Sequence, residues 1–141
     1  MTNPIPQSHR DLLERPVHAV LTTMMPDGQP QSSLVWCDYD GEHILISTTC
    51  ERQKGKNMAA NSKVTLLIID PDDSSRYLEV RGQVIEMTEV GAIDLADRLT
   101  REYTGKTRFY GDIYPVEQQY RETRVICKIQ PVKISLDAIF K

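Results

Sequence analysis

The chain has 141 residues and a net charge of −3, with 26% charged and 40% hydrophobic residues. This length and composition are typical of one globular domain covering residues 1–141. The acidic balance disfavours a general nucleic-acid binder, which normally presents a basic surface. No apolar run approaches the roughly 20 residues of a membrane-spanning helix, so neither nucleic acid nor membrane is an expected partner.

The N-terminal segment is polar and contains Pro4 and Pro6. It lacks the apolar core of a signal peptide, so we expect a cytoplasmic location. Residues 7–14 predict a short helix with Ser8 as its N-cap. This helix should stop at Arg15, because the residue before a proline is pushed out of the helical region.

Three strands rich in β-branched and apolar residues follow, and they predict an antiparallel meander over residues 17–25, 30–40 and 42–48. The first turn is "PDGQ", Pro26–Gln29, in which a proline and a glycine both favour a reversal of the chain. The second is Asp40-Gly41, a strong hairpin signal.

Two further strands are predicted beyond residue 60. Residues 63–70 form the fourth, and the unbroken apolar run Val64–Ile69 indicates burial on both faces of the sheet. Residues 76–88 alternate between polar and apolar side chains, which predicts a long fifth strand that bends at Gly82.

The pattern then changes to helical spacing over residues 89–103, with Thr88 as a reasonable N-cap and an apolar face made by Ala92, Leu95, Ala96, Leu99 and Tyr103. A sixth strand covers residues 123–131, and residues 132–141 add a short extended tail. Six strands joined by short links, with flanking helices, predict a mainly β (α+β) antiparallel barrel rather than alternating βαβ units.

Catalytic and metal-binding motifs are absent from the sequence. The three cysteines, Cys37, Cys50 and Cys127, form no C-x-x-C pair, and His9, His18 and His43 lack the spacing of metal ligands. We therefore expect no metal and can name no catalytic side chain. If the protein is an enzyme, a cofactor should carry the chemistry.

A basic cluster follows the third strand. Ser47, Thr48 and Thr49 end that strand, Arg52 and Lys54 come next, and a helical turn opens near residue 53. Hydroxyls, a guanidinium, an ammonium and a helix N-terminus all suit a phosphate group. The alternative is a solvated surface run of charge, and composition alone leaves both interpretations open.

Three segments resemble the pyridoxamine-phosphate-oxidase-like superfamily of flavin and deazaflavin enzymes, and they cover residues 21–58, 63–73 and 76–89. The combination of "PDGQPQSSLVW" with "ERQKGKN" carries most of the similarity. It is closest to the deazaflavin-dependent B-type branch, which includes enzymes that use coenzyme F-420. The resemblance implies a split β-barrel homodimer with its cofactor sites at the dimer interface.

The resemblance also implies cofactor-binding residues. The backbone at Ser33, Leu34, Val35 and Trp36 should lie along the ring system, and the phosphate should meet Ser47, Thr48, Thr49, Arg52, Lys54 and, nearby, Asn57. Tyr77 matches an aromatic position that can reach the site of the partner subunit. The segment "NMAANSK" after the cluster is less basic than is usual in the family, which offers fewer cations to an oligoglutamate tail.

We therefore expect an F-420-dependent oxidoreductase that passes a hydride to a small conjugated substrate, with FMN as the second candidate cofactor. A non-catalytic cofactor-binding or stress protein of the same fold is the alternative. Residues 104–120 should line part of the substrate pocket. Arg108, Tyr110 and Tyr114 are candidates for a lid, although such aromatic side chains can equally pack against the barrel.

Overall fold

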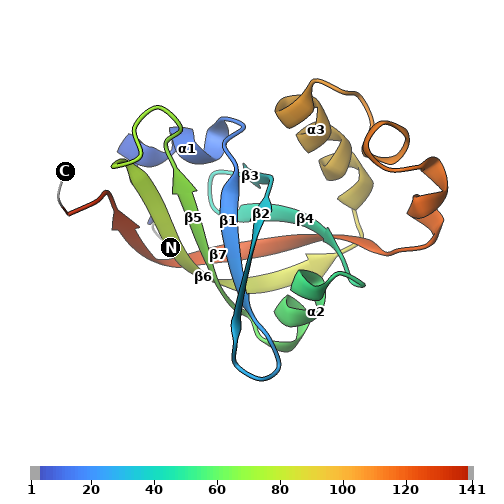
Figure 1. Cartoon of the computed structure of the whole chain (residues 1–141), viewed down its shortest axis with the longest axis horizontal. Helices are drawn as coiled ribbons and strands as arrows, with labels where there is room; N and C mark the ends of the chain where they lie inside the picture. The colour runs from blue at the N-terminus through green and yellow to red at the C-terminus, as the bar shows by residue number, and fades with distance from the viewer. Residues whose placement is uncertain (1–3, 140–141) are drawn as a thin grey trace.

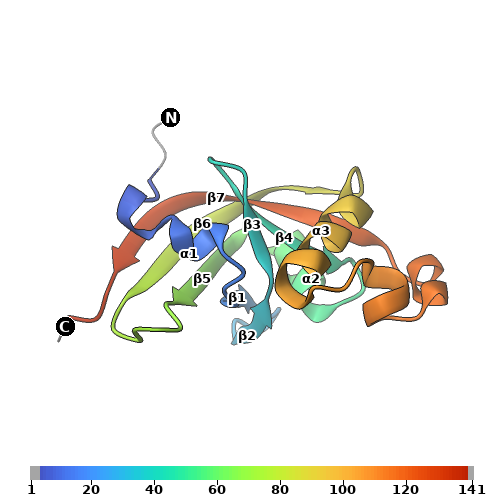
Figure 2. The same cartoon turned by 90° about the horizontal axis from the view of Figure 1, so that it is seen from above.

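The computed structural model describes residues 4–139 and contains one curled antiparallel sheet of seven strands, in the order β2-β1-β5-β6-β7-β4-β3 (Figures 1 and 2). The strands are β1 (Ala19–Met24), β2 (Pro30–Val35), β3 (Cys37–Tyr39), β4 (Ile44–Thr49), β5 (Lys63–Ile69), β6 (Tyr77–Thr88) and β7 (Arg124–Leu136). The mainly β, α+β class predicted from sequence is confirmed. Of the predicted tail, residues 140 and 141 lie outside the described residues.

The number of strands differs from the six predicted. The expected second strand, residues 30–40, is divided at Trp36 into β2 and β3. These two strands form the opposite edges of the sheet although one residue separates them in sequence, so the sheet must curl until its edges approach each other. The division therefore goes with the curling of the sheet into a half-barrel, and the predicted simple meander is wrong at this point. The hairpins β1–β2 and β3–β4 are confirmed.

The two longest strands, β6 and β7, pair along most of their length. The predicted sixth strand and tail are one continuous strand, β7. A register shift lies between Arg81 and Gly82, which confirms the predicted bend. A Cβ atom at Gly82 would lie 2.8 Å from the carbonyl oxygen of Gln130, so the close approach of β7 requires glycine there.

Helices cover the two ends of the sheet (Figures 1 and 2). They are α1 (Asp11–Glu14), α2 (Gln53–Ala60) and α3 (Ala92–Thr104), with the shorter turns η1 (Gln7–His9), η2 (Phe109–Ile113) and η3 (Val116–Tyr120). Ala92, Leu95, Ala96 and Leu99 are buried, which confirms the predicted apolar face of α3. The predicted cap Thr88 lies too early, because α3 begins after Gly91.

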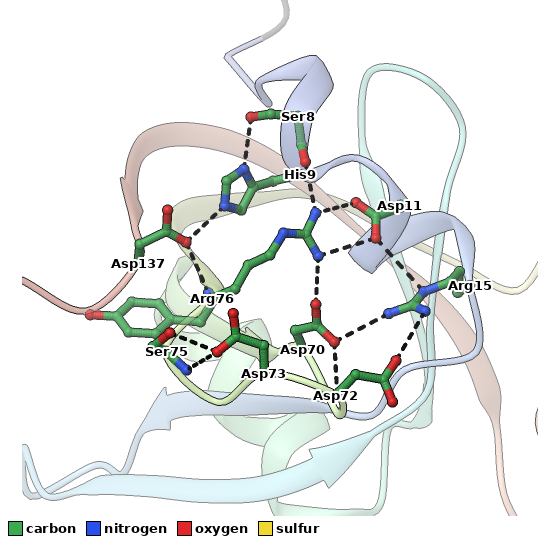
Figure 3. A network of polar contacts seen from close by, with 11 residues as sticks. Ser8, His9, Asp11, Arg15, Asp70, Asp72, Asp73, Ser75, Arg76 and Asp137 are labelled. Carbon is green, nitrogen blue, oxygen red and sulfur yellow. Dashed lines mark hydrogen bonds and ion pairs between the residues drawn. The ribbon is translucent and has the colours of Figure 1, made fainter. Parts of the chain in front are cut away.

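A polar network ties the N-terminal turns to the rest of the fold (Figure 3). Arg76, which precedes β6, donates to both carboxylate oxygens of Asp11, to Asp70 and to the carbonyl oxygen of Ser8. His9 contacts Asp137 at 2.9 Å. Ser8 is not the helix cap that we predicted, because its hydroxyl contacts Nδ1 of His9 instead.

The outer face of the sheet is apolar along one row of side chains. Leu34, Val20 and Leu67 lie opposite one another on β2, β1 and β5. Leu34 is 66% exposed and Ile69 is 40% exposed. The predicted burial of β5 on both faces is therefore wrong for a single chain, because Val64, Leu66 and Ile68 alone are buried, and they face the core.

Candidate functional site

The basic cluster is held in place by the end of β4 and the start of α2. The hydroxyl of Thr49 accepts a hydrogen bond from the backbone N–H of Arg52 at 3.2 Å, and the side chain of Thr49 is fully buried. Gly55 faces this corner, since a Cβ atom there would lie 2.0 Å from the carbonyl oxygen of Thr49. The helix can approach β4 this closely only with glycine at that position. This close approach fixes the positions of Arg52 and Lys54 at the start of the helix.

A cavity of about 220 Å³ opens beside this cluster. Its lining comes from β2, the Trp36 break, β4, α2, α3, η2 and β7, and consists of Leu34, Val35, Trp36, Ser47, Thr48, Arg52, Lys54, Ala96, Leu99, Phe109, Ile113, Tyr114 and Arg124. Both segments that the resemblance singled out therefore meet at one cavity. The side chains divide into a cationic, hydroxyl-bearing part and an apolar, aromatic part.

Three cations surround the polar part: Arg52, Lys54 and Arg124. Within residues 4–139, no carboxylate lies within 4.0 Å of Arg52 or Lys54. Burial lowers the pKa of Lys54, and the positive charges of Arg52 and Arg124 lower that pKa further. A lysine that is made less basic by neighbouring cations marks a concentration of positive charge, which an anion would relieve.

Arg124 was missing from the sequence prediction. Its side chain is 4% exposed, and its guanidinium carbon lies 4.2 Å from the ring centroid of Phe109. The guanidinium donates to Ser47 at 3.0 Å, to the hydroxyl of Tyr110 at 3.0 Å and to Glu122 at 3.3 Å. Arg124 begins a strand 70 residues away from the basic cluster and belongs to no motif, so only the pairing of β4 with β7 could have indicated it.

Thr48 supplies a second unusual feature. Its hydroxyl oxygen is buried and, among the described residues, has no hydrogen-bond partner. Thr48 lines the cavity next to Ser47. A buried hydroxyl without a partner costs free energy in the folded state, so this position is suited to a ligand atom that would satisfy it.

The opposite wall is aromatic. Trp36 stacks on Tyr103, with ring centroids 5.4 Å apart and an interplanar angle of 17°, and meets Phe109 edge to face at 6.5 Å. Tyr114 accepts a hydrogen bond from Arg52 at 2.9 Å and packs against Phe109. The segment 104–120 therefore does line the cavity, through Phe109, Ile113 and Tyr114. Of the lid candidates, Arg108 and Tyr110 do not line it, and Tyr110 is buried.

Four of the predicted cofactor-binding residues do not line the cavity: Ser33, Thr49, Asn57 and Tyr77. Thr49 supports the backbone of Arg52, as described above. Asn57 is buried, and its amide donates to Thr23 at 3.0 Å, which fastens α2 to β1. Tyr77 begins β6 beside Asp137, among the residues of the polar network. The structure thus gives Thr49 and Asn57 supporting roles in the single chain.

The cysteines and the possible metal ligands of residues 4–139 form no further cluster. Cys37 and Cys127 are buried and Cys50 is exposed, all three as free thiols, and burial raises the pKa of both buried thiols to about 12. Among residues 4–139, no group of three His, Cys, Asp or Glu side chains is arranged to hold a metal. No helix in the same range has the length and hydropathy to cross a membrane.

The amino-acid sequence matches the family of pyridoxamine 5'-phosphate oxidases over residues 5–136, which is nearly the whole chain. The chain belongs to the pyridoxamine 5'-phosphate oxidase family. A comparison with curated proteins found no match.

Solved structures extend this result. The chain is 37% identical to an F420 reductase, with a TM-score of 0.77, over 93% of this chain and 98% of that one. It shares the fold of a conserved hypothetical protein from Mycobacterium tuberculosis, at 23% identity and a TM-score of 0.66 over 94% and 84% of the two chains. It also shares the fold of General Stress Protein 26 from Bacillus anthracis, at 19% identity and a TM-score of 0.62 over 90% and 88%.

Proposed function

We propose that the protein is an oxidoreductase that binds coenzyme F-420 in the cavity between β4, α2 and α3 and reduces a small conjugated substrate. The observation that carries this proposal is the cavity itself, which three cations and two hydroxyl-bearing residues line together with an apolar, aromatic wall. The 37% identity to an F420 reductase supports deazaflavin over other ring systems.

The residues of the cavity fit the two parts of such a cofactor. Arg52, Lys54 and the hydroxyls of Ser47 and Thr48 would hold the phosphate, since charged and hydroxyl donors suit its oxygens. The backbone from Leu34 to Trp36 would lie along the ring system. When bound, the reduced deazaflavin supplies a hydride. The aromatic side chains of η2 would exclude water and orient the substrate.

We further propose that a second copy of the chain completes the site. The cavity of about 220 Å³ is smaller than the roughly 300–1,000 Å³ of ordinary ligand sites. Leu34 lines this cavity and also belongs to the exposed apolar row on the outer sheet face. A partner seated on that row would bury it and would extend the wall of the cavity. Tyr77 of the partner subunit is the residue proposed to reach the site.

FMN is the second candidate cofactor, because it carries a phosphate but no anionic tail. Beyond the cluster, α2 offers Lys56 as its one further cation, so few charges remain for an oligoglutamate chain. A non-catalytic role in binding the cofactor stays the alternative function. Oxidation of reduced F-420 in the presence of an enone would distinguish an enzyme from a binding protein.

The phosphate assignment can be tested by changing Arg52 and Lys54 together to alanine. Each lost charge-assisted hydrogen bond is worth about 1.5–3 kcal/mol, so the affinity for F-420 or FMN should fall by about 100-fold or more. Riboflavin, which lacks the phosphate, should bind the variant and the parent protein equally. Fluorescence titration measures all three affinities.

The matched control removes two cations outside the cavity, Lys106 and Arg108, both of which are exposed. This double alanine variant loses the same charge and should bind every ligand as the parent protein does. Unchanged FMN and F-420 affinity in the Arg52/Lys54 variant would refute the site. Failure of the parent protein to bind either cofactor would refute the function.

A further inference from the structure

Arg124 has an unusual combination of burial and spare hydrogen-bonding capacity. A guanidinium carries five N–H donors. Three of them are accepted by Ser47, Tyr110 and Glu122. Among the described residues, no acceptor is found for the remaining donors on its two terminal nitrogens, although the side chain is 4% exposed and lines the cavity. Buried charged donors without acceptors are costly, which points to a ligand.

The neighbouring groups indicate the chemistry of that ligand. Ser47, which accepts a hydrogen bond from Arg124, lines the cavity with it. Thr48, whose buried hydroxyl has no partner among the described residues, lines the same cavity. The charge of Arg124 reaches Lys54, whose pKa it helps to lower, even though Glu122 contacts the guanidinium. The positive charges of Arg52, Lys54 and Arg124 therefore meet in one cavity, and the ligand that suits them is an anion with several oxygen atoms.

Glu122 does not neutralise this site completely. Its carboxylate is shared, since Oε2 also accepts the hydroxyl of Tyr110 at 2.5 Å and Oε1 accepts the amide of Gln118 at 3.0 Å. Its contact with Arg124 is the longest of the three, at 3.3 Å. The carboxylate therefore holds the guanidinium from the side of the segment 110–122, and Arg124 also lines the cavity.

We propose that Arg124 is a specificity-determining residue that binds the phosphate directly, as the inner cation opposite Arg52 and Lys54. This inference rests on the proposed function, because it assigns a further contact to the same phosphate. The aromatic ring of Phe109 and the hydroxyl of Tyr110 hold the guanidinium in one orientation. A fixed planar fork matches two phosphate oxygens better than a flexible ammonium does.

Two substitutions of Arg124 test the proposal, with FMN and riboflavin as probes. Arg124→Gln should weaken FMN binding by about 10- to 100-fold, the worth of one charge-assisted contact. Arg124→Lys keeps the positive charge but loses the planar guanidinium, so the loss of FMN affinity should be smaller than for Arg124→Gln. Riboflavin affinity should be unchanged in both. The control is Arg121→Gln, which removes an exposed arginine three residues earlier and should leave all affinities unchanged.

Glu122→Gln provides a test that does not depend on the survival of an Arg124 variant. It keeps the shape of the side chain and removes the negative charge behind the guanidinium. FMN should then bind several-fold more tightly, with riboflavin unaffected. Unchanged or weaker FMN binding would contradict the proposal.

The outcomes separate this inference from the function on which it rests. If the Arg52/Lys54 variant loses FMN affinity and the Arg124 variants do not, Arg124 is outside the phosphate site and the inference alone is wrong. Equal losses for FMN and riboflavin would also overturn it, because Arg124 would then only shape the cavity. If the parent protein binds no phosphorylated cofactor, the proposed function is wrong as well.

Discussion

At the scale of single residues, two neighbouring threonines of the candidate site differ in their hydrogen bonds. Thr48 and Thr49 are consecutive and both buried, yet their hydroxyls are treated differently. The hydroxyl of Thr49 accepts the N–H of Arg52, whereas that of Thr48 has no partner among the described residues. The hydroxyl of Thr49 supports the backbone at Arg52, and that of Thr48 is the one proposed to meet a ligand atom.

This difference predicts opposite effects for two conservative substitutions. Thr48→Val removes an unsatisfied hydroxyl, so the free energy of unfolding of the free protein should rise by about 1 kcal/mol. The same change should weaken FMN binding by about 10-fold, because a hydrogen bond to the phosphate is lost. Urea unfolding without ligand and a cofactor titration measure the two quantities.

Thr49→Val is the matched comparison. It leaves the N–H of Arg52 with the backbone carbonyl of Thr49, at 3.3 Å, as its one acceptor among the described residues. The loss of the side-chain acceptor should lower the free energy of unfolding by up to about 1 kcal/mol. If both variants change stability in the same direction, the hydroxyl of Thr48 is satisfied in solution, and its assignment to the phosphate is wrong.

At the scale of secondary-structure elements, the site depends on how closely α2 approaches the end of β4. Gly55 is in a helix, where alanine normally stabilises by about 0.8–1 kcal/mol. Here a Cβ atom would lie 2.0 Å from the carbonyl oxygen of Thr49. The helix would have to move away from the strand, and the start of α2, which carries Arg52 and Lys54, would move with it.

Gly55→Ala should therefore destabilise the protein by about 1–3 kcal/mol, the usual range for overpacking, and should weaken phosphate-dependent binding. Ala60→Gly, at the exposed end of the same helix, tests helix propensity alone. It should lower the free energy of unfolding by no more than about 1 kcal/mol and leave FMN affinity unchanged. Thermal unfolding and titration of both variants check this. A stabilised Gly55→Ala protein would show that the close approach does not exist in solution.

The elements also show what the sequence could and could not predict. Local patterns predicted most elements well, because periodicity and turn residues act over a few positions. The break at Trp36 was missed, since a strand that continues into the opposite edge of a curled sheet looks like one uninterrupted strand. Arg124 was missed for a related reason: its role comes from the pairing of β4 with β7, which is not a local property.

The resemblance to the family indicated a site for the basic cluster, which residue spacing alone left ambiguous. The run after β4 was compatible with a solvated surface, but Arg52 and Lys54 line a cavity together with Leu34 and Trp36. The role that the resemblance implies for Tyr77 cannot be checked in the same way. Tyr77 is the first residue of β6. That strand begins at the end of the sheet away from α2 and α3 (Figure 1), so the proposed role of Tyr77 requires a second subunit.

At the scale of the whole molecule, the apolar row on the outer sheet face remains to be explained. Leu34, Val20 and Leu67 lie side by side on three strands, and Ile69 adds a further exposed side chain at the end of β5. The sequence of β5 is apolar on both sides, as in strands that are buried on both faces. A single chain buries one side, so a second copy is the expected cover for the other.

Leu67→Lys tests this arrangement. Leu67 is partly exposed in the single chain, so the new ammonium can reach water and the monomer should stay folded. A desolvated charge at the centre of an apolar interface should prevent association. Sedimentation equilibrium should therefore find a dimer for the parent protein and a monomer for the variant, with unchanged circular dichroism. Cofactor affinity should fall in parallel, because the partner is proposed to complete the cavity.

Val90→Lys is the control for surface charge. Val90 is 83% exposed in the turn before α3, outside the apolar row, so this variant should remain a dimer and bind the cofactor normally. A parent protein that is monomeric while loaded with cofactor would contradict the shared site. A dimeric Leu67→Lys protein would instead show that the interface lies on another face of the sheet. The proposed contact of Tyr77 would then depend on that other interface.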